Sequence, residues 1–347
     1  HWHGVIPFGL SHRPDGLNDG FWAQLAGRFY PLAGIETRIG TEQYFVPRRP
    51  IRPAGHLAGM AADGTIAIAD ADVERIEPAE GVGGLNRVVA GDRRHEARHV
   101  WLCAGALGTP GILARSGLID SGPRTVSDHL IGYAGQLAAS AASEAVMAKV
   151  RRHRDGVFFP FLFGGGREHF FTLRPARFDF AALDAGIAKR AVFGLPTSRV
   201  ASGLAGNMSP GLIAEALYNK FGLFARAGRY SVYFQTVVPD AYLLGDDGAL
   251  KPGPVRATGD AIARAQAQAP FADIIPTQQP ALYIPGIHLH GSLTRDECER
   301  FGTGRPFNSL HVVDASALRD IGPEHHSFAM MAAAFGRAVT VASQDRS

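Results

Sequence analysis

The spacing of apolar and polar residues predicts short strands and helices that alternate along the chain. Apolar positions alternate with polar ones, between Gly and Asp turns, in four segments that we predict as strands: 65–69, 72–77, 86–90 and 99–103. A helix should follow the last strand, with Thr109 as its N-cap and Pro110 at its first helical position. That helix should end near Ser116-Gly117.

Residues 130–280 have a different pattern, rich in aromatic residues. Segments 156–163 and 169–174 should form a hairpin across Gly164–Gly166, and Tyr230–Val238 should form a long strand. Further elements are expected as helices at 212–226 and 258–269, a turn at 246–248, a short helix at 21–27 and an irregular stretch at 44–54. The middle of the chain therefore predicts a sheet with helices on one side.

The composition of the 347-residue chain is that of an ordinary globular protein with room for two domains, with 46% hydrophobic and 19% charged residues. A net charge of +3, without a basic face, argues against nucleic-acid binding. No run of 18 apolar residues is present, so no membrane span is expected. Two cysteines do not make a disulfide framework, and Cys103 should be a small buried residue. These features fit a cytoplasmic protein and leave a periplasmic one open.

Gly105-Ala106-x-x-Thr109-Pro110-x-Ile112-Leu113-x-x-Ser116-Gly117-Leu118 is the first stretch that indicates chemistry. Its glycines let a ligand approach the backbone, and the helix that follows could face an anion. The stretch resembles the second signature of the glucose–methanol–choline (GMC) flavoprotein oxidoreductases. Ile119 stands where that signature ends in Gly.

The C-terminal part carries three further resemblances to this family. His288–Ser292 is similar to the family's H-x-x-G-T, and Val312–Ser316 resembles its V-V-D-A-S. His325 then falls where the family has its second active-site residue, and Ser327–Arg337 resembles the closing helix under the flavin. The departures are Thr294-Arg295, where the family has Arg-Met, and Arg319, where it has Pro.

The resemblance covers residues 1–10, 65–135 and 280–345, and it implies a mixed α/β and α+β fold. Residues 1–135 and 281–347 would form a Rossmann-like FAD-binding domain, and 136–280 an antiparallel-sheet substrate domain. The family's G-x-G-x-x-G phosphate loop is missing from this sequence. We therefore expect the FAD-binding domain to be incomplete at its N-terminus and the chain to bind FAD weakly by itself.

The implied activity is oxidation of an alcohol or sugar CH–OH group to a carbonyl, with hydride transfer to flavin N5. A neutral imidazole, with an ordinary pKa near ~6.5, suits removal of the hydroxyl proton. The resemblance makes His288 this base and His325 its partner. It makes nine residues cofactor contacts: His1, Val73, Ala104, Gly105, Thr109, Asp314, Ala315, His326 and Ser327. His1-Trp2 resembles the covalent flavin attachment of the pyranose-oxidase-like branch.

Other interpretations of the histidines stay open. His290 should point opposite to His288 along an extended segment and serve a structural role. His288, His290, His325 and His326, with Asp314, could instead bind a metal ion. A non-redox lyase of the same fold would use the histidines for acid–base catalysis. A further hypothesis is that the chain is an inactive fragment. The sequence does not choose the electron acceptor or the individual alcohol.

Overall fold

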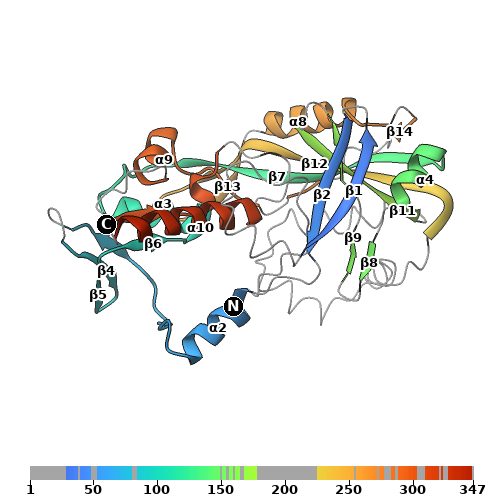
Figure 1. Cartoon of the computed structure of the whole chain (residues 1–347). Helices are drawn as coiled ribbons and strands as arrows, with labels where there is room; N and C mark the ends of the chain where they lie inside the picture. The colour runs from blue at the N-terminus through green and yellow to red at the C-terminus, as the bar shows by residue number, and fades with distance from the viewer. Residues whose placement is uncertain are drawn as a thin grey trace, which may run out of the picture.

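A computed structural model describes most of the chain as a mixed arrangement of helices and mainly antiparallel strands (Figure 1). The described residues are 29–37, 40–47, 53–79, 84–148, 151–153, 156–158, 161–164, 168–177, 225–253, 255–271, 273–276, 283–285, 288–302, 309–319, 322 and 327–345. The expected mixture of helix and sheet is confirmed.

A seven-stranded antiparallel sheet is the largest element. Its strands, in the order β10-β11-β12-β7-β14 with β13 on β12 and β15 on β7, are β10 (Phe161–Gly164), β11 (His169–Arg177), β12 (Ala225–Leu244), β7 (Arg124–Ala138), β14 (Ile275–Pro276), β13 (Leu250–Pro252) and β15 (Tyr283–Pro285). The long strands β7 and β12 run from this sheet toward the other half of the molecule (Figure 1).

The second half is built from small sheets and three helices. Its elements are β3 (Arg75–Glu77), β4 (Asn86–Ala90), β5 (Arg93–Ala97), β6 (Val100–Leu102), α3 (Gly105–Arg115), α9 (Arg295–Gly302), β16 (Leu310–Val312), the short 3₁₀ turn η2 (Ala315–Ala317) and α10 (Ser327–Gln344). β3, β4 and β5 form an antiparallel meander, whereas β6 and β16 pair in parallel. Parallel pairing brings the carboxyl ends of β6 and β16 to the same edge.

The other described elements lie outside these two sets. They are β1 (Phe29–Thr37), β2 (Gly40–Pro47), α2 (Pro53–Ala62), α4 (Ala141–Met147), β8 (Arg151–His153), β9 (Gly156–Phe158) and α8 (Val255–Ala267). β1 pairs with β2, and β8 pairs with β9, in both cases antiparallel. Among the helices of the described segments, none combines the length and apolar character that crossing a membrane requires.

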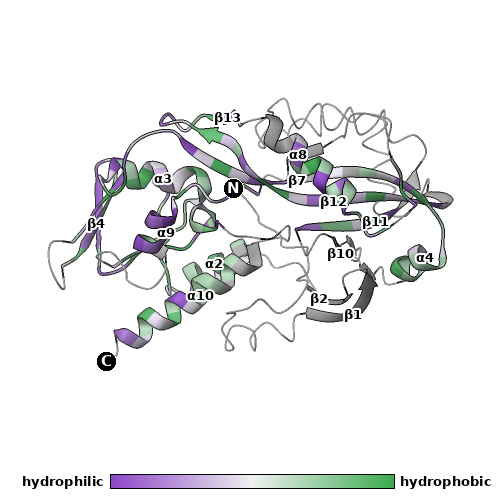
Figure 2. Cartoon of the chain, turned by 90° about the horizontal axis from the view of Figure 1, so that it is seen from above, coloured by the Kyte–Doolittle hydropathy of each residue, from purple (hydrophilic) through white to green (hydrophobic). Residues whose placement is uncertain are grey.

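Two large hydrophobic cores stabilise the halves, and a smaller one joins them. The first lies between the seven-stranded sheet and α8, which lies against β12 (Figure 2) and contributes Ala261 and Ala265. The second includes Leu113, Leu293 and Leu310. The third combines Ala106, Val126, Leu244 and Ala315. Burial of each of these leucine side chains stabilises the folded state by roughly 1.5–3 kcal/mol.

Several predicted elements are confirmed. The strand through Tyr230–Val238, the turn at 246–248 and a helix over most of 258–269 are present. The hairpin predicted from 156–163 and 169–174 forms only in part: β10 pairs with β11, whereas residues 156–158 pair with β8. The strand predicted at 86–90 forms in full, and those predicted at 72–77 and 99–103 form in part, as 75–77 and 100–102. α3 ends at Arg115, with Ser116 as its C-cap, and Gly117 follows with a φ of 66°.

Other predictions are wrong. Residues 65–69 form no strand, and part of the irregular stretch at 44–54 belongs to β2 and α2. The helix at 21–27 and most of 212–226 lie outside the described residues, although Ala225 and Arg226 begin β12. The structure does not test the predicted division into domains; residue 135, where the first part was expected to end, lies within β7.

The start of α3 also differs from the prediction. The helix begins at Gly105, with Ala104 as its N-cap, so Thr109 and Pro110 lie inside it. The carboxylate of Asp314 accepts a hydrogen bond from the N–H of Gly105, which is a backbone donor of the first helical turn. This turn begins four residues before Thr109. A distant acidic residue therefore caps this helix, and no local cap signal marks it.

Gly132 and Phe234 provide a test of the large sheet. They are directly paired across β7 and β12, and a Cβ atom at Gly132 would overlap Cζ of the buried Phe234 ring. We expect Gly132→Ala to lower the free energy of unfolding by about 1–3 kcal/mol through overpacking. In urea unfolding, the additional change Phe234→Leu should recover part of that loss. Additive losses in the double variant would contradict the close contact.

Candidate functional site

The His288–Ser292 segment is anchored on β7 by backbone hydrogen bonds. The Ser127 N–H donates to the His290 carbonyl at 2.9 Å, and the His290 N–H donates back to the Ser127 carbonyl at 3.0 Å. The His288 N–H donates to Oδ1 of Asp128 at 2.7 Å. The predicted base thus lies beside a buried carboxylate that the sequence prediction did not single out.

Three imidazoles gather at this position. The His129 ring lies 5.3 Å from the His288 ring, edge to face, and 5.6 Å from the His290 ring. His129 and His290 are fully buried, and His129 Nε2 lies 2.9 Å from the Gly322 carbonyl. The prediction that His290 points opposite to His288 is wrong. Residues two apart on an extended segment share a face, and Leu289 between them packs in the joining core.

Burial sets the protonation of these rings. Loss of solvent lowers the pKa of His288 below its ordinary value of 6.5, and nearby His290 lowers it further. Burial likewise lowers the pKa of His290, while the hydrogen bond between its Nδ1 and the His288 carbonyl raises it less. His288 is therefore neutral at pH 7 and can accept a proton. The hydrogen bond and burial of His290 fit the structural role predicted for it.

Gly291 requires the flexibility of glycine. Its φ is 71°, and a Cβ atom there would lie 3.1 Å from the Leu318 carbonyl oxygen. Its N–H donates to the Ala315 carbonyl at 2.9 Å, and the Leu293 N–H donates to the Ser316 carbonyl at 3.0 Å. The histidine segment is therefore fixed to the turn that follows β16.

Asp314 joins that turn to the start of α3. Its Oδ2 accepts hydrogen bonds from the Gly105 N–H at 2.9 Å and the Thr109 hydroxyl at 2.5 Å. Its Oδ1 accepts from the N–H of Ser316 at 2.8 Å and from the Ser316 hydroxyl at 2.5 Å. Thr109 is fully buried, so it acts on the site through Asp314. The anion expected at the helix N-terminus is thus a carboxylate of the protein itself.

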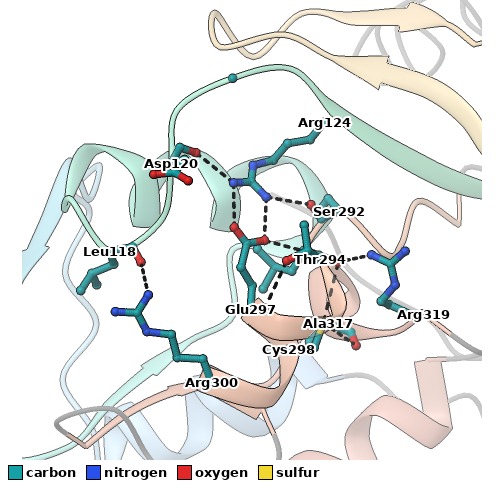
Figure 3. A network of polar contacts seen from close by, with 12 residues as sticks. Leu118, Asp120, Arg124, Ser292, Thr294, Glu297, Cys298, Arg300, Ala317 and Arg319 are labelled. Atoms are coloured by element: carbon teal, nitrogen blue, oxygen red, sulfur yellow. Dashed lines mark hydrogen bonds and ion pairs between the residues drawn. The ribbon is translucent and has the colours of Figure 1, made fainter.

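An ion pair secures the other side of the histidine segment (Figure 3). The guanidinium of Arg124 bonds both carboxylate oxygens of Glu297, at 2.7 and 2.9 Å, and also reaches the Asp120 carbonyl. Burial raises the pKa of Glu297, but its bonds to Arg124 and Thr294 outweigh that effect, and the net pKa is lowered. A bidentate, mostly buried pair of this kind fixes the geometry of both side chains.

Two of the residues that depart from the family pattern, Thr294 and Arg319, have local roles in this network. The Thr294 N–H donates to Glu297 Oε2, and Thr294 Oγ1 accepts from the Glu297 N–H, which together cap α9. The Arg319 guanidinium donates to the Leu293 carbonyl at 2.5 Å. Both departures therefore hold the chain that follows His290 (Figure 3).

The turn after β6 leaves its main chain open to a ligand. Cys103 and Ala104 are exposed at the carboxyl edge of β6 and β16, where open α/β sheets bind ligands. Gly105 has a φ of 75° and open space at its Cβ position. The prediction that Cys103 is buried is wrong, because β6 already ends at Leu102. Since the Asp314 carboxylate already has four protein donors, one of them the Gly105 N–H, the exposed groups of this turn are those of Cys103 and Ala104.

The remaining predicted contacts are only partly placed. Val73 packs against the second core, Ala315 is buried in η2, and Ser327 is the first residue of α10. His1, His325 and His326 lie outside the described residues. Within the described ranges, no group of three or more His, Cys, Asp or Glu side chains is arranged to hold a metal ion.

The sequence prediction missed Asp128 and His129. The signal was Ser127-Asp128-His129, a polar triplet between apolar residues of a strand that was not predicted. Neither a known protein-family model nor a curated protein sequence matches the chain. The motif resemblance and the geometry above are therefore the basis for any functional assignment.

Replacement of Asp314 tests the junction. In Asp314→Asn an NH₂ group faces two of the four donors, so we expect a loss of about 2–4 kcal/mol in the free energy of unfolding. Urea unfolding with Asp260→Asn, on the exposed surface of α8, provides the control, which should change by less than about 0.5 kcal/mol. Equal stability of the two variants would contradict a central role for Asp314.

Proposed function

We propose that the protein is an FAD-dependent oxidoreductase of the GMC type that oxidises an alcohol to a carbonyl. The observation that carries this proposal is the contact between segments far apart in the sequence. Hydrogen bonds connect the turn after β6 to Asp314, the Asp314 turn to Gly291, and the His288 segment to β7. Three motifs that resemble those of one family, separated by up to about two hundred residues, thus meet in one place.

In this proposal residues 1–135 and 281–347 form the FAD-binding part, and 136–280 form the substrate part. The main chain at Ala104 and Gly105 contacts the cofactor, and Asp314 holds that turn in place. The resemblance adds Val73, Ala315, His326, Ser327 and His1 as further contacts. The flavin, when bound, supplies a hydride acceptor for the carbon that carries the hydroxyl.

The residues of the chain supply the proton chemistry and the orientation. Neutral His288 removes the substrate hydroxyl proton, which its lowered pKa permits at pH 7. The resemblance assigns His325 to hold the substrate oxygen. We propose a sugar or another polyol as the substrate class, on the basis of the His1-Trp2 resemblance.

Two alternatives use the same histidines. A metal site is less favoured, because His290 already bonds the His288 carbonyl and the described residues offer no metal-binding group. A non-redox lyase would keep the fold and the acid–base role of His288. Bleaching of bound flavin by an alcohol distinguishes the oxidoreductase from the lyase.

The test is anaerobic reduction of bound flavin by a panel of sugars, polyols and simple alcohols. The protein is expressed as its gene encodes it and is loaded with FAD. We expect at least one alcohol to bleach the flavin, and His288→Gln to slow bleaching by about 10²–10⁴-fold. Because protonation inactivates the base, the wild-type rate should fall as the pH drops through a pKa below 6.5.

The matched control is His95→Gln, which changes an exposed histidine on β5. Its bleaching rate and pH profile should equal those of the wild type. FAD binding without bleaching by any alcohol would favour the lyase. A fully active His288→Gln variant would contradict the assignment of the base.

A further inference from the structure

The partners of β7 change register at the histidine cluster. Pro285 of β15 pairs with Leu130, whereas His290 pairs with Ser127. In a continuous antiparallel ladder the two residue numbers of every pair have the same sum. The sum is 415 for the first pair and 417 for the second, so the register shifts between them. Such irregularities redirect side chains and often lie beside functional sites.

The opposite neighbour of β7 changes register at the same level. On β12, Val238 pairs with Asp128 and Tyr242 with Val126, with a register shift between them. Asp240, within that shift, has a φ of 52°, and its N–H donates to the Ser127 hydroxyl at 3.3 Å. Residues 126–128 of β7 therefore lie between two interruptions of the sheet.

The interruption changes the hydrogen-bond partner of His288. Ser127 and His290 exchange both backbone hydrogen bonds, so a regular antiparallel ladder would pair His129 with His288 next. The His288 N–H instead donates to the carboxylate of Asp128. A side chain has replaced the main-chain partner of the predicted base.

We propose that Asp128 is the positioning residue of His288, an inference that rests on the proposed function. Asp128 is 3% exposed, and its Oδ2 lies 3.4 Å from the donating hydroxyl of Tyr242 on β12. Its carboxylate fixes the backbone of His288 outside the ladder, where the imidazole lies against His129 and near His290. Asp128 acts through this backbone hydrogen bond and does not touch the substrate.

The first test measures turnover in two variants of similar size. Asp128→Asn keeps an oxygen that can accept the His288 N–H, whereas Asp128→Leu keeps the shape without an acceptor. We expect Asp128→Leu to lower kcat by about 10–100-fold with little change in KM, and Asp128→Asn to lose no more than about threefold. Asp260→Leu, at an exposed position of α8, is the control and should match the wild type.

The second test measures the pKa of His288 without flavin, from the pH dependence of its carbethoxylation followed by mass spectrometry. Burial is the main cause of the lowered pKa. Release of the backbone in Asp128→Leu should therefore raise the pKa toward ~6.5, while Asp128→Asn should leave it near the wild-type value. A purely electrostatic role predicts the opposite: removal of the negative charge would lower the pKa of His288 in both variants.

The outcomes separate this inference from the proposed function. If the wild type bleaches flavin but Asp128→Leu behaves like the wild type in both tests, the positioning role is wrong. If the wild type never bleaches flavin, the proposed function fails, and the pKa of His288 still tests the role of Asp128. If Asp128→Leu does not fold, Tyr242→Phe should raise the pKa of His288 by a smaller amount. An unchanged pKa in that variant would overturn the inference.

Discussion

The carboxylate of Asp314 accepts hydrogen bonds from the first turn of α3 and from its own turn after β16. These groups are distant in sequence and meet only because β6 and β16 pair in parallel. The turn that Asp314 holds also presents the carbonyls of Ala315 and Ser316 to the histidine segment. Without an acceptor at this point, buried donors on both sides would lose their partners.

β7 connects the region around Asp314 to the rest of the molecule. The strand begins with Arg124, whose ion pair with Glu297 secures α9, and continues into the seven-stranded sheet. Between these regions it carries Ser127, Asp128 and His129 against the predicted base. The neighbouring strands change register there, so the regular ladder gives way to side-chain hydrogen bonds where the proposed chemistry needs a fixed imidazole.

The parts of the structure that local pattern determines could be predicted from the sequence. The alternation in Tyr230–Val238 predicts its strand, and Ser116-Gly117 predicts the end of α3. The motif segments pointed to His288 and Asp314, which the structure connects through Gly291 and Ala315. These features need only the periodicity or chemistry of neighbouring residues.

Features that depend on distant partners could not be predicted in this way. The start of α3 is set by Asp314, about two hundred residues later. β7 was missed because Gly132, Gly135 and the polar triplet interrupt its alternation of apolar and polar residues. It is stabilised by pairing with β12, which lies about a hundred residues later in the sequence. Cys103 follows an apolar run but lies past the end of β6 and is exposed.

A crystal structure of the FAD-loaded protein would show directly whether the described residues meet the cofactor. We expect the isoalloxazine ring to lie within reach of the His288 imidazole, with the cofactor against the main chain of Cys103 and Ala104 and the Asp314 carboxylate still bonded to Gly105 and Ser316. A flavin bound elsewhere, or a metal ion between His288 and His290, would contradict this expectation.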